Sequence, residues 1–563
     1  MRRNRLAVAI AILIAVTVVP IAASATATAA ALDGTDANPA PVAPADSDPG
    51  NTSNTPDIVE IAPNPYVDDD AGEFVAIEVP RPTNVTGWTL ADDEGRVARL
   101  PPETLDGVVI LTVEPGSIPR TQNRTVRSLD GRLALANGGD EIQLRRPNGS
   151  VVATVRYESA PEGARYRRVG DSWRWRPAGA TALEPIVTNP ESARAFVLPD
   201  APGVVEDELR AADDRIYLAG YTLTSDRVVR ALLDAQRRGV EVHVLLEGSP
   251  VGGVSQREDD ALDRLSSAGV RVSVRSGERD PYRFHHAKYA VIDDRALVLT
   301  ENFKPAGSGG HSSRGWGVVL DDPELATALI ELFHADSRGP GAIPWEAHRS
   351  TVDPVQDYAS QESFPTHFAP ESVSVERARL LVAPDNARPE LVDLFRSANS
   401  SIRIQQMAIE GVDDPLLQAS IAAARNGTEV EILLSSASYV REENRRLVED
   451  LDRLAARDDL PISARIVEPR GRFEKVHAKV AIVDDEHVVL GSLNWNPTAY
   501  GENREVVVVL TGAEVSAYYA AVFESDAQSR NLWRVPAGLV SVVSAVWLAL
   551  GLLAVARIRW ARS

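Results

Sequence analysis

Two nine-residue stretches decide the fold of this chain: HAKYAVIDD at residues 286–294 and HAKVAIVDD at residues 477–485. In each, a histidine and a lysine two positions apart precede a run of apolar, β-type residues and a pair of aspartates. Side chains at positions i and i+2 of a strand lie on the same face, so the histidine and lysine of each stretch are expected to reach one site. One such pattern is a weak signal, whereas its repetition is a strong one.

The sequence around the two stretches is itself duplicated. RAFVLPD at 194–200 and RLLVAPD at 379–385 open two segments that continue with strands and helices in the same order. Alternation of helices with apolar strands predicts two α/β units with buried parallel or mixed sheets. The repeat is too long for a solenoid, so we predict a pseudo-dimer of domains at 190–348 and 376–530.

Each copy carries the same residue types after its motif. Thr300-Glu-Asn302 follows the first stretch and Ser492-Leu-Asn494 follows the second. The repeated HxKxxxxD pattern with a downstream G-[ST]-x-N resembles the phospholipase D superfamily, over roughly residues 190–530. The resemblance implies tandem domains that meet at a pseudo-twofold interface and cleave a phosphodiester through a phosphohistidine, with no metal and no other cofactor.

The resemblance also implies a role for each residue type. One imidazole attacks phosphorus and the other protonates the leaving oxygen, while lysine and asparagine side chains bind the non-bridging oxygens. Thr300 would donate a hydrogen bond nearby. The two motif aspartates are included, although an aspartate at a strand-to-turn junction commonly caps the turn. The candidate catalytic residues are His286, Lys288, Asp293, Asn302, His477, Lys479, Asp484, Ser492, Asn494 and Glu505.

The first copy departs from the family pattern. Leu299 stands where the family has glycine, and the stretch 313–316 contains no acid where the second copy has Glu505. The family places a histidine-orienting carboxylate there. We therefore expect Glu505 to hold the tautomer of His477 and raise its basicity, which favours His477 as the nucleophile and His286 as the acid–base group.

The composition excludes several kinds of chemistry. The 563 residues are too many for one ordinary core and include no cysteine, which excludes disulfides, thiolate metal sites and cysteine nucleophiles. The formal net charge of −21 disfavours non-specific binding to polyanions. Lysine occurs only four times, at positions 288, 304, 475 and 479. Acid excess with few lysines resembles halophilic proteins, and a genome bias toward arginine codons is the alternative.

Residues 57–180 differ from the duplicated part. Short β-type runs such as 73–79 and 107–113 alternate with Gly, Pro, Asn and Asp turns, which predicts an all-β, immunoglobulin-like sandwich. Gly87-Trp88, the run 135–142 and Asn148-Gly149 resemble the lamin-tail domain, which implies a binding or positioning module. We expect its tryptophans, Trp88, Trp173 and Trp175, to pack in the fold rather than form a ligand platform.

The ends of the chain predict export and anchoring. Arginines before an apolar run predict a signal peptide over 1–30, with an uncleaved anchor as the alternative. Residues 31–56 read as a disordered linker. The uncharged segment 535–556 is long enough to span a bilayer, and the arginines of 557–563 place this tail in the cytoplasm. The expected location is the cell membrane, single-pass, with most of the chain extracellular.

Three functions compete at this stage. A phospholipid phosphodiesterase or phosphatidyltransferase is favoured, because the anchor would hold the catalytic unit beside lipid head groups. An extracellular nuclease is the second, disfavoured because we recognise no basic stripe with interleaved aromatics. A non-catalytic surface-binding protein with a decayed first copy is the third. The loops at 248–257, 304–314 and 435–441 are expected to select the substrate. The site is expected to be complete within one chain; neither the oligomeric state nor the choice of water or alcohol as acceptor is predicted.

Overall fold

The structure is a computed structural model that describes residues 55–65, 72–118, 125–170, 172–181, 183–277 and 280–528. The signal peptide, nearly all of the linker, the spanning segment 535–556 and the tail 557–563 lie outside these residues. No helix among the described residues is long and apolar enough to cross a bilayer. The predictions for the two ends of the chain therefore stay predictions.

The first described region is built from strands alone. A six-stranded sheet has the order β11-β10-β1-β2-β5-β6, and a five-stranded sheet has the order β7-β4-β3-β8-β9. Both sheets contribute to one core, in which Ile61 and Val75 of the first join Leu90 and Ile142 of the second. The predicted all-β character is confirmed, and the resemblance to the lamin-tail domain stays a prediction. The strands are β1 Asp57–Asn64, β2 Phe74–Asn84, β3 Thr89–Ala91, β4 Val97–Arg99, β5 Thr104–Thr112, β6 Thr125–Ser128, β7 Asp130–Gly131, β8 Asp140–Arg145, β9 Val151–Tyr157, β10 Ala164–Val169 and β11 Ser172–Pro177.

The hairpin of β10 and β11 holds a feature that the sequence interpretation overlooked. Arg165 lies opposite Arg176 and Arg167 opposite Arg174, so four arginines share one face of the hairpin. Tyr166, Trp173 and Trp175 alternate with them on the other face, where they pack against the core. The tryptophans are packing residues, as expected. The pair of strands therefore has a basic face, on which Arg165 and Arg167 lie within ion-pair distance of Glu60, while the aromatic rings point the other way. The expectation that the chain lacks a basic stripe with interleaved aromatics stays a prediction.

The rest of the described chain forms two α/β units with one strand order. The first sheet runs β20-β16-β15-β14-β17-β18-β19-β13-β21, and the second runs β12-β22-β29-β28-β27-β23-β24-β25. The central strands β14 and β15 pair in parallel, as do β23 and β24, whereas β17 and β27 join them antiparallel. The predicted tandem α/β fold with mixed sheets is confirmed.

The elements of the two units correspond along the chain. β12 Ile186–Thr188 precedes the first unit in the chain but pairs with β22 at the edge of the second sheet. The first unit consists of β13 Ser192–Leu198, α1 Gly203–Arg210, β14 Arg215–Gly220, α2 Asp226–Arg238, β15 Glu241–Glu247, α3 Gln256–Ser267, β16 Arg271–Arg275, β17 Tyr289–Ile292, β18 Arg295–Leu299, β19 Ser313–Asp321, α4 Pro323–Arg338, β20 Ala342–Pro344, α5 Trp345–His348, the 3-10 helix Arg349–Thr351 and β21 Glu371–Val373. The second consists of β22 Arg377–Ala383, α6 Ala387–Arg396, β23 Ser401–Gln406, α7 Pro415–Arg425, β24 Glu429–Leu434, α8 Arg441–Asp458, β25 Ile462–Ile466, β26 Lys475–Val476, β27 Lys479–Val483, β28 His487–Gly491, α9 Pro497–Gly501, β29 Glu505–Thr511 and α10 Ala513–Ala527.

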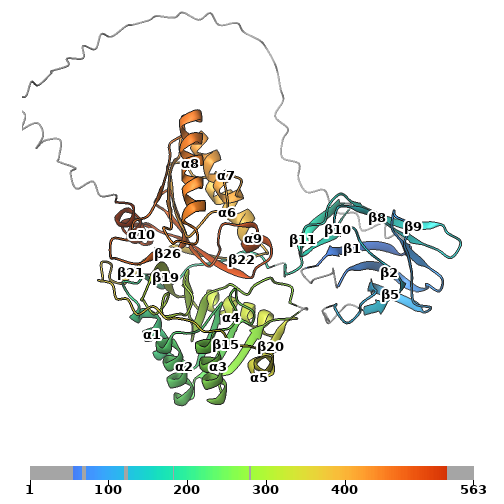
Figure 1. Ribbon diagram of the computed structural model, residues 1–563, viewed down its shortest axis with the longest axis horizontal. Coiled ribbons are helices and arrows are strands. Elements are labelled where there is room, and N and C mark those ends of the chain that lie inside the picture. The colour runs from blue at the N-terminus through green and yellow to red at the C-terminus, as the bar shows by residue number, and fades with distance from the viewer. Residues whose placement is uncertain are drawn as a thin grey trace, which may run out of the picture. The chain divides into compact units, whose positions relative to one another are not determined.

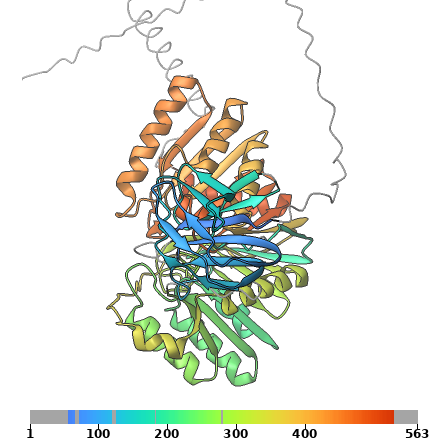
Figure 2. The same cartoon turned by 90° about the vertical axis from the view of Figure 1, so that its right-hand side faces the viewer.

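Each sheet has an outer face covered by its own helices. Figure 1 shows α1, α2 and α3 on the first unit and α6, α7 and α8 on the second. These helices are amphipathic: Val228, Leu232 and Ala235 of α2 recur at helical spacing and are buried in the first outer core. In the turned view the two sets of helices lie on opposite outer sides with the sheets between them (Figure 2).

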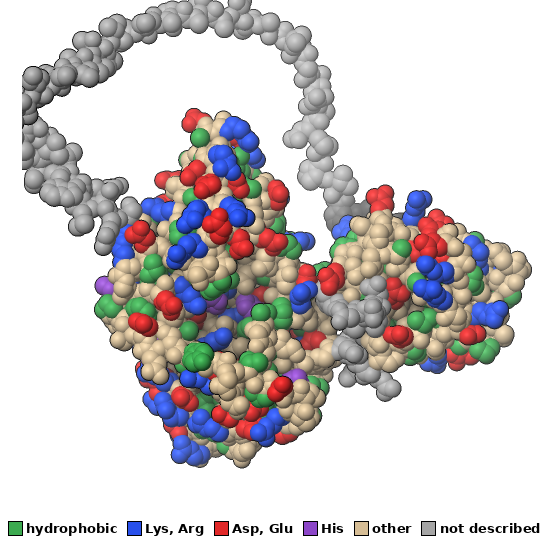
Figure 3. Space-filling view, in the orientation of Figure 1, with side chains coloured by type: hydrophobic (Ala, Val, Ile, Leu, Met, Phe, Trp, Pro, Cys, Tyr) green, Lys and Arg blue, Asp and Glu red, His purple; other side chains and the backbone are tan. Residues whose placement is uncertain are grey.

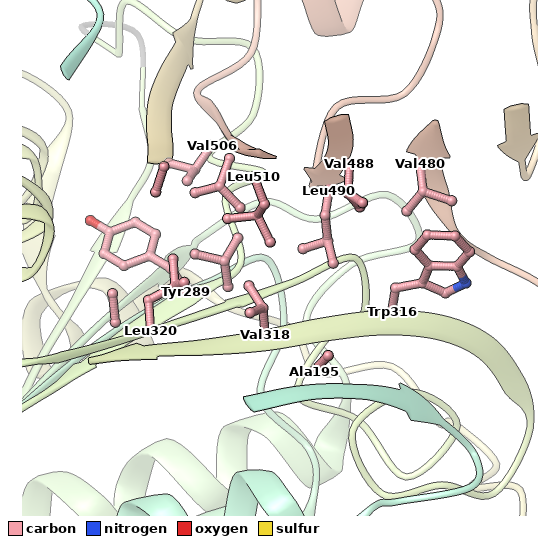
Figure 4. Packing of buried hydrophobic residues seen from close by; sticks show 14 of the residues in the cluster. Ala195, Tyr289, Trp316, Val318, Leu320, Val480, Val488, Leu490, Val506 and Leu510 are labelled. Carbon is pink, nitrogen blue, oxygen red and sulfur yellow. The ribbon is translucent and has the colours of Figure 1, made fainter. Parts of the chain in front are cut away.

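The inner faces of the two sheets form one common core. Trp316, Val318 and Leu320 of β19 belong to the same buried cluster as Leu490 of β28 and Val506 of β29 (Figure 4). At about 25 cal/mol per Å² of buried apolar surface, a core of this size stabilises the pair of units as one body. The two units are therefore held in a fixed relation in which their motifs can meet.

Two arginines at the start of corresponding strands tie the units together. Arg314, next to the start of β19, binds Asp200 of its own unit at 2.6 Å and Asp526 of the other unit at 2.9 Å. Arg504, which precedes β29, binds Asp385 at 3.0 Å and Asp336 of the first unit at 3.1 Å. All of these side chains are fully or almost fully buried. Against the effect of burial, the charge of Arg504 lowers the pKa of Asp336 to about 2.

Candidate active site

The motif histidines lie where the two units cross. The backbone N–H of His286 donates to the carbonyl of Arg504 at 2.9 Å, and that of His477 donates to the carbonyl of Arg314 at 3.0 Å. Each histidine is thus fixed by the backbone of the opposite unit. The structure brings the two motifs together at one site, in agreement with the predicted pseudo-twofold arrangement.

Each histidine pairs with a carboxylate from the opposite unit. Nδ1 of His286 lies 2.9 Å from both carboxylate oxygens of Glu505, and Nδ1 of His477 lies 3.2 Å from Oε1 of Glu301. Our expectation that Glu505 orients His477 was therefore wrong. The reason is the crossing: Arg504, immediately before Glu505, pairs with the segment that carries His286.

Glu301 is a site residue that sequence reasoning missed. Gly315 is the equivalent of Glu505, because Gly315 pairs with Leu198 and Glu505 pairs with Ala383, the corresponding ends of β13 and β22. A Cβ atom on Gly315 would lie 2.2 Å from Cγ of Glu301. The carboxylate of the first copy has therefore moved from the strand position to the middle of the Thr300-Glu-Asn302 motif, where it occupies the space that Gly315 leaves.

The other departure of the first copy is compensated in the same way. Leu299 replaces the family glycine, and its cross-strand partner is Gly317, whereas Gly491 of the second copy is paired with Val507. A Cβ atom on Gly491 would meet the carbonyl oxygen of Val506 at 2.2 Å, and one on Gly317 would meet Leu299 at 2.7 Å. The large and small residues are exchanged between neighbouring strands, so the volume at this point is conserved.

The two lysines lie beside the histidines and are buried. Nζ of Lys288 donates to the carbonyl of His286 at 2.6 Å, and Nζ of Lys479 donates to the carbonyl of His477 at 2.7 Å. Burial lowers the pKa of both: that of Lys479 falls to about 8, and that of Lys288 falls well below its ordinary range. The two ammonium groups face the carboxylates of Glu301 and Glu505, which oppose this lowering.

The electrostatics keep both imidazoles neutral near pH 7. Burial lowers the pKa of His286 and of His477 to about 4, against the attraction of their carboxylate partners. In His286 the neutral form exposes a lone pair on Nε2, because Nδ1 keeps its hydrogen toward Glu505. Binding of an anion between the lysines would raise the pKa of every cation in the site, which would allow one imidazole to hold a proton.

The two motif aspartates lie away from this cluster. Asp293 accepts hydrogen bonds from the backbone N–H groups of residues 213–215 at 2.9–3.0 Å, and Asp484 accepts from those of residues 399–401 at 2.8–3.1 Å. Both have positive φ, 52° and 56°, at the turn after the motif strand. The structure places them as turn-capping groups, because their acceptor oxygens are used by the neighbouring loop.

The hydroxyl residues of the two motifs, Thr300 and Ser492, have a different role from the amide residues, Asn302 and Asn494. Ser492 is buried and accepts from the N–H of Val506 at 3.0 Å, and Thr300 does the same for Trp316 at 3.0 Å. These hydroxyls hold the strand that carries Glu505 and its counterpart. Asn302 and Asn494 are half-buried, and within the described residues their side-chain oxygens have no hydrogen-bond partner. The described part of the chain contains no group of three or more His, Asp or Glu residues arranged to hold a metal ion.

Residues 205–337 and 391–527 match the family described as "Cardiolipin synthase, PLD-like domain". The matched stretches, one in each α/β unit, support a PLD-like domain of the cardiolipin synthase and phospholipase D superfamily in each unit. Among curated proteins, cardiolipin synthase B of Salmonella typhi is 26% identical over 325 residues, 55% of this chain and 73% of the relative. Phospholipase D of Rickettsia bellii is 26% identical over 127 residues, 23% of this chain and 59% of the relative. Among solved structures, phosphatidylserine synthase of Haemophilus influenzae aligns over 64% of this chain and 94% of its own length, at 15% identity and a TM-score of 0.44.

Proposed function

We propose that this protein cleaves or transfers the phosphodiester of a phospholipid through a phosphohistidine, at a membrane to which residues 535–556 anchor it. The observation that carries the proposal is the pair of histidine–carboxylate contacts between the units, each with a buried lysine beside it. One imidazole serves as nucleophile and one as acid, and the ammonium groups offset the charge of the phosphoryl oxygens.

The geometry favours His286 as the nucleophile. Glu505 is fully buried, contacts Nδ1 of His286 with both oxygens, and accepts a further hydrogen bond from Nδ2 of Asn503 at 3.0 Å. The contact of Glu301 with His477 is longer, at 3.2 Å. Glu505 therefore fixes the tautomer and the orientation of its imidazole more firmly than Glu301 does, which favours His286 over His477 as the nucleophile.

The proposed reaction has two steps that balance. Nε2 of His286 attacks phosphorus and the P–O bond to the leaving alcohol breaks as His477 donates its proton to that oxygen. His477, now neutral, takes a proton from water or an alcohol, whose oxygen attacks phosphorus and breaks the P–N bond. Water gives hydrolysis, and an alcohol acceptor gives transfer of the phosphatidyl group.

Phospholipid is the proposed substrate because the curated relatives are named cardiolipin synthase and phospholipase D. Nucleic acid is the second candidate, and the observation that favours it is the arginine face of the β10–β11 hairpin, since arginine side chains bind phosphate groups. A non-catalytic role is disfavoured, because both departures of the first copy are compensated rather than left as defects.

The test uses the purified full chain in strong salt with EDTA, offered phosphatidylglycerol vesicles with and without an added alcohol, and single-stranded DNA in parallel. Loss of lipid turnover in His286→Ala and His477→Ala supports the proposal. His487→Ala is the matched control, because this half-buried histidine of the second copy contacts Thr511 and no site residue. Cleavage of DNA without turnover of lipid would replace the proposal with the nuclease, and abolition of activity by EDTA would contradict the phosphohistidine.

A nitrophenyl phosphodiester identifies the nucleophile. Its leaving group needs no proton, so His477→Ala should still form an acid-labile, alkali-stable phosphoenzyme, whereas His286→Ala should form none. The reverse result would return the nucleophile to His477.

A further inference from the structure

Two corresponding loops carry exposed apolar side chains. The loop between β15 and α3 contains a turn in which the N–H of Gly253 donates to the carbonyl of Pro250 at 2.8 Å, with Val251 at its corner, 79% exposed. The loop between β24 and α8 contains a turn in which Val440 donates to Ala437 at 3.1 Å, with Tyr439 at its corner, 56% exposed. Turn corners normally hold polar residues or glycine, so an apolar side chain at both related corners requires an explanation.

Both corners are connected to the catalytic histidines by direct contacts. On the first loop, the N–H of Val251 donates to the hydroxyl of Tyr221 at 2.7 Å, and the Tyr221 ring lies edge-on to the ring of His286 with centroids 5.0 Å apart. On the second loop, the Tyr439 hydroxyl lies 3.7 Å from Sδ of Met407, whose N–H donates to Ala478, the residue after His477. The two apolar corners therefore lie beside the two halves of the site.

A third segment adds apolar surface to the same rim. Val355 and Tyr358 are 41% and 97% exposed, and the N–H of Val355 donates to Val254 of the first loop at 2.9 Å. Ser360 reaches the loop that follows Asn302, where its hydroxyl donates to the carbonyl of His311 at 2.5 Å. Half of the large apolar side chains that are exposed in the described part of the chain thus lie on these three segments. In Figure 3 apolar side chains border the hollow in which histidine side chains are visible.

Two lysines, Lys304 and Lys475, lie next to this apolar rim. Lys304 follows Asn302 by two residues, and Nζ of Lys475 lies 5.3 Å from the ring of Tyr439. Both lysines are half-buried, so their charge is presented between the rim and the buried lysines of the site. The nearest acid on the third segment, Asp357, is paired with Arg257 at 3.4 Å. Apolar side chains at the edge with cations and aromatic rings below them match the layering of a bilayer surface, where acyl chains lie beneath phosphate groups.

We propose that the rim formed by Val251, Val355, Tyr358 and Tyr439 docks on a phospholipid leaflet and opens the active site directly into the head-group layer. This proposal rests on the proposed function for its substrate, and it adds that the substrate is taken from the bilayer and not from solution. A nucleic acid has no apolar layer to receive Val251 and Val355, so these two side chains favour the leaflet over a nucleic acid.

The absence of cysteine makes a direct test possible. The full chain is prepared with a single Val251→Cys or Tyr439→Cys, labelled with an environment-sensitive nitrobenzoxadiazole dye, and bound to phosphatidylglycerol vesicles that contain brominated lipid. Val187→Cys is the matched control, because Val187 is 52% exposed and lies beside Arg379, toward the end of β22 opposite to the site. Quenching at 251 and 439 but not at 187 supports docking, and equal dye exposure at all three positions would overturn it.

Activity provides a second, separate readout. In Val251→Asp and Tyr439→Asp the rate on vesicles divided by the rate on monomeric dihexanoyl-phosphatidylglycerol should fall about tenfold for each change, because each removes one large apolar insertion. The same ratio should be unchanged in Val187→Asp. A ratio that stays within twofold of wild type in both rim variants contradicts the docking proposal, whereas a wild-type chain that turns over neither lipid but whose rim dyes are quenched contradicts the proposed function alone.

Discussion

The relocated carboxylate of the first copy predicts a swap that can be tested in two steps. Glu301→Leu removes the partner of His477 and installs the residue that the second copy has at this position, Leu493. Nδ1 of His477 and Oε1 of Glu301 approach to 3.2 Å without a hydrogen bond in the resting site, and a hydrogen bond forms between them when His477 is protonated. Such a charge-assisted hydrogen bond is worth about 1.5–3 kcal/mol, and its loss in the transition state corresponds to a rate lower by about 10- to 150-fold. We expect kcat/KM to fall by this factor.

The second step returns the carboxylate to the strand. Gly315→Glu alone should destabilise the fold, because its Cβ atom would lie 2.2 Å from Cγ of Glu301 and two carboxylates would share a buried space. In the double variant Glu301→Leu, Gly315→Glu the space is free, and the new side chain starts from the position that Glu505 uses to reach His286. We expect most of the lost activity to return.

The assay is release of the head-group alcohol from phosphatidylglycerol vesicles at pH 7, whose leaving oxygen needs the proton of His477, together with the Tm of each variant. A Glu301→Leu variant within twofold of wild type would refute the positioning role. A double variant that folds normally but is no more active than Glu301→Leu would refute the proposed equivalence of the two positions. The reciprocal change in the second copy, Leu493→Glu with Glu505→Gly, gives the matched control on His286.

Four further predictions concern buried charges and turn caps. The kcat/KM for a nitrophenyl diester should stay constant as the pH falls from 7 to 5, because the pKa of His286, lowered to about 4, keeps its imidazole neutral. A decrease in kcat/KM with an apparent pKa near 6.5 would contradict this prediction. The value of kcat/KM should also fall as the pH rises through about 8, where Lys479 loses its proton. A kcat/KM that does not change between pH 7 and pH 10 would contradict this prediction. Asp293→Ala should lower the free energy of unfolding by about 1–3 kcal/mol in urea titration with kcat unchanged, and a selective loss of kcat would show that the carboxylate acts in the site. Arg504→Gln should cost about 3–5 kcal/mol because it leaves the buried Asp336 without its partner, and an unchanged Tm would disprove the structural role of this pair.

The sequence predicts the architecture of the duplicated part because its signals are local. The apolar strands at 289–292 and 480–483 and the amphipathic helix at 226–238 each read correctly from residues close together in the chain. The duplication then predicts that the two motifs meet. The motif did not predict the orientation of Asp293 and Asp484. Each lies seven positions after its histidine, and this spacing alone does not reveal that the side chain points toward a neighbouring loop and away from the site.

The pairing of carboxylates with histidines could not be read from the sequence. It depends on which backbone each unit crosses, and Arg504 meets residues 284–286, which are about 220 positions away in the chain. Glu301 was missed for a related reason: a family pattern follows the order of the chain, whereas Glu301, in the bend after β18, and a side chain at Gly315 of β19 would fill the same point in space. An acid in the middle of the Thr-x-Asn motif, together with a glycine at the position of Glu505, is the signal that could have found it.

These contacts make catalysis depend on the interface between the units. His286 takes its carboxylate and its backbone hydrogen bond from the second unit, and His477 takes both from the first. Neither unit holds a complete histidine–carboxylate pair by itself. Arg314 and Arg504 make buried ion pairs with Asp526 and Asp336 through their side chains, and their own backbone carbonyls accept the N–H groups of His477 and His286. A change that loosens this interface should therefore lower activity before it unfolds either outer core, because the two histidines lose their orientation while the helices that cover each sheet keep their packing.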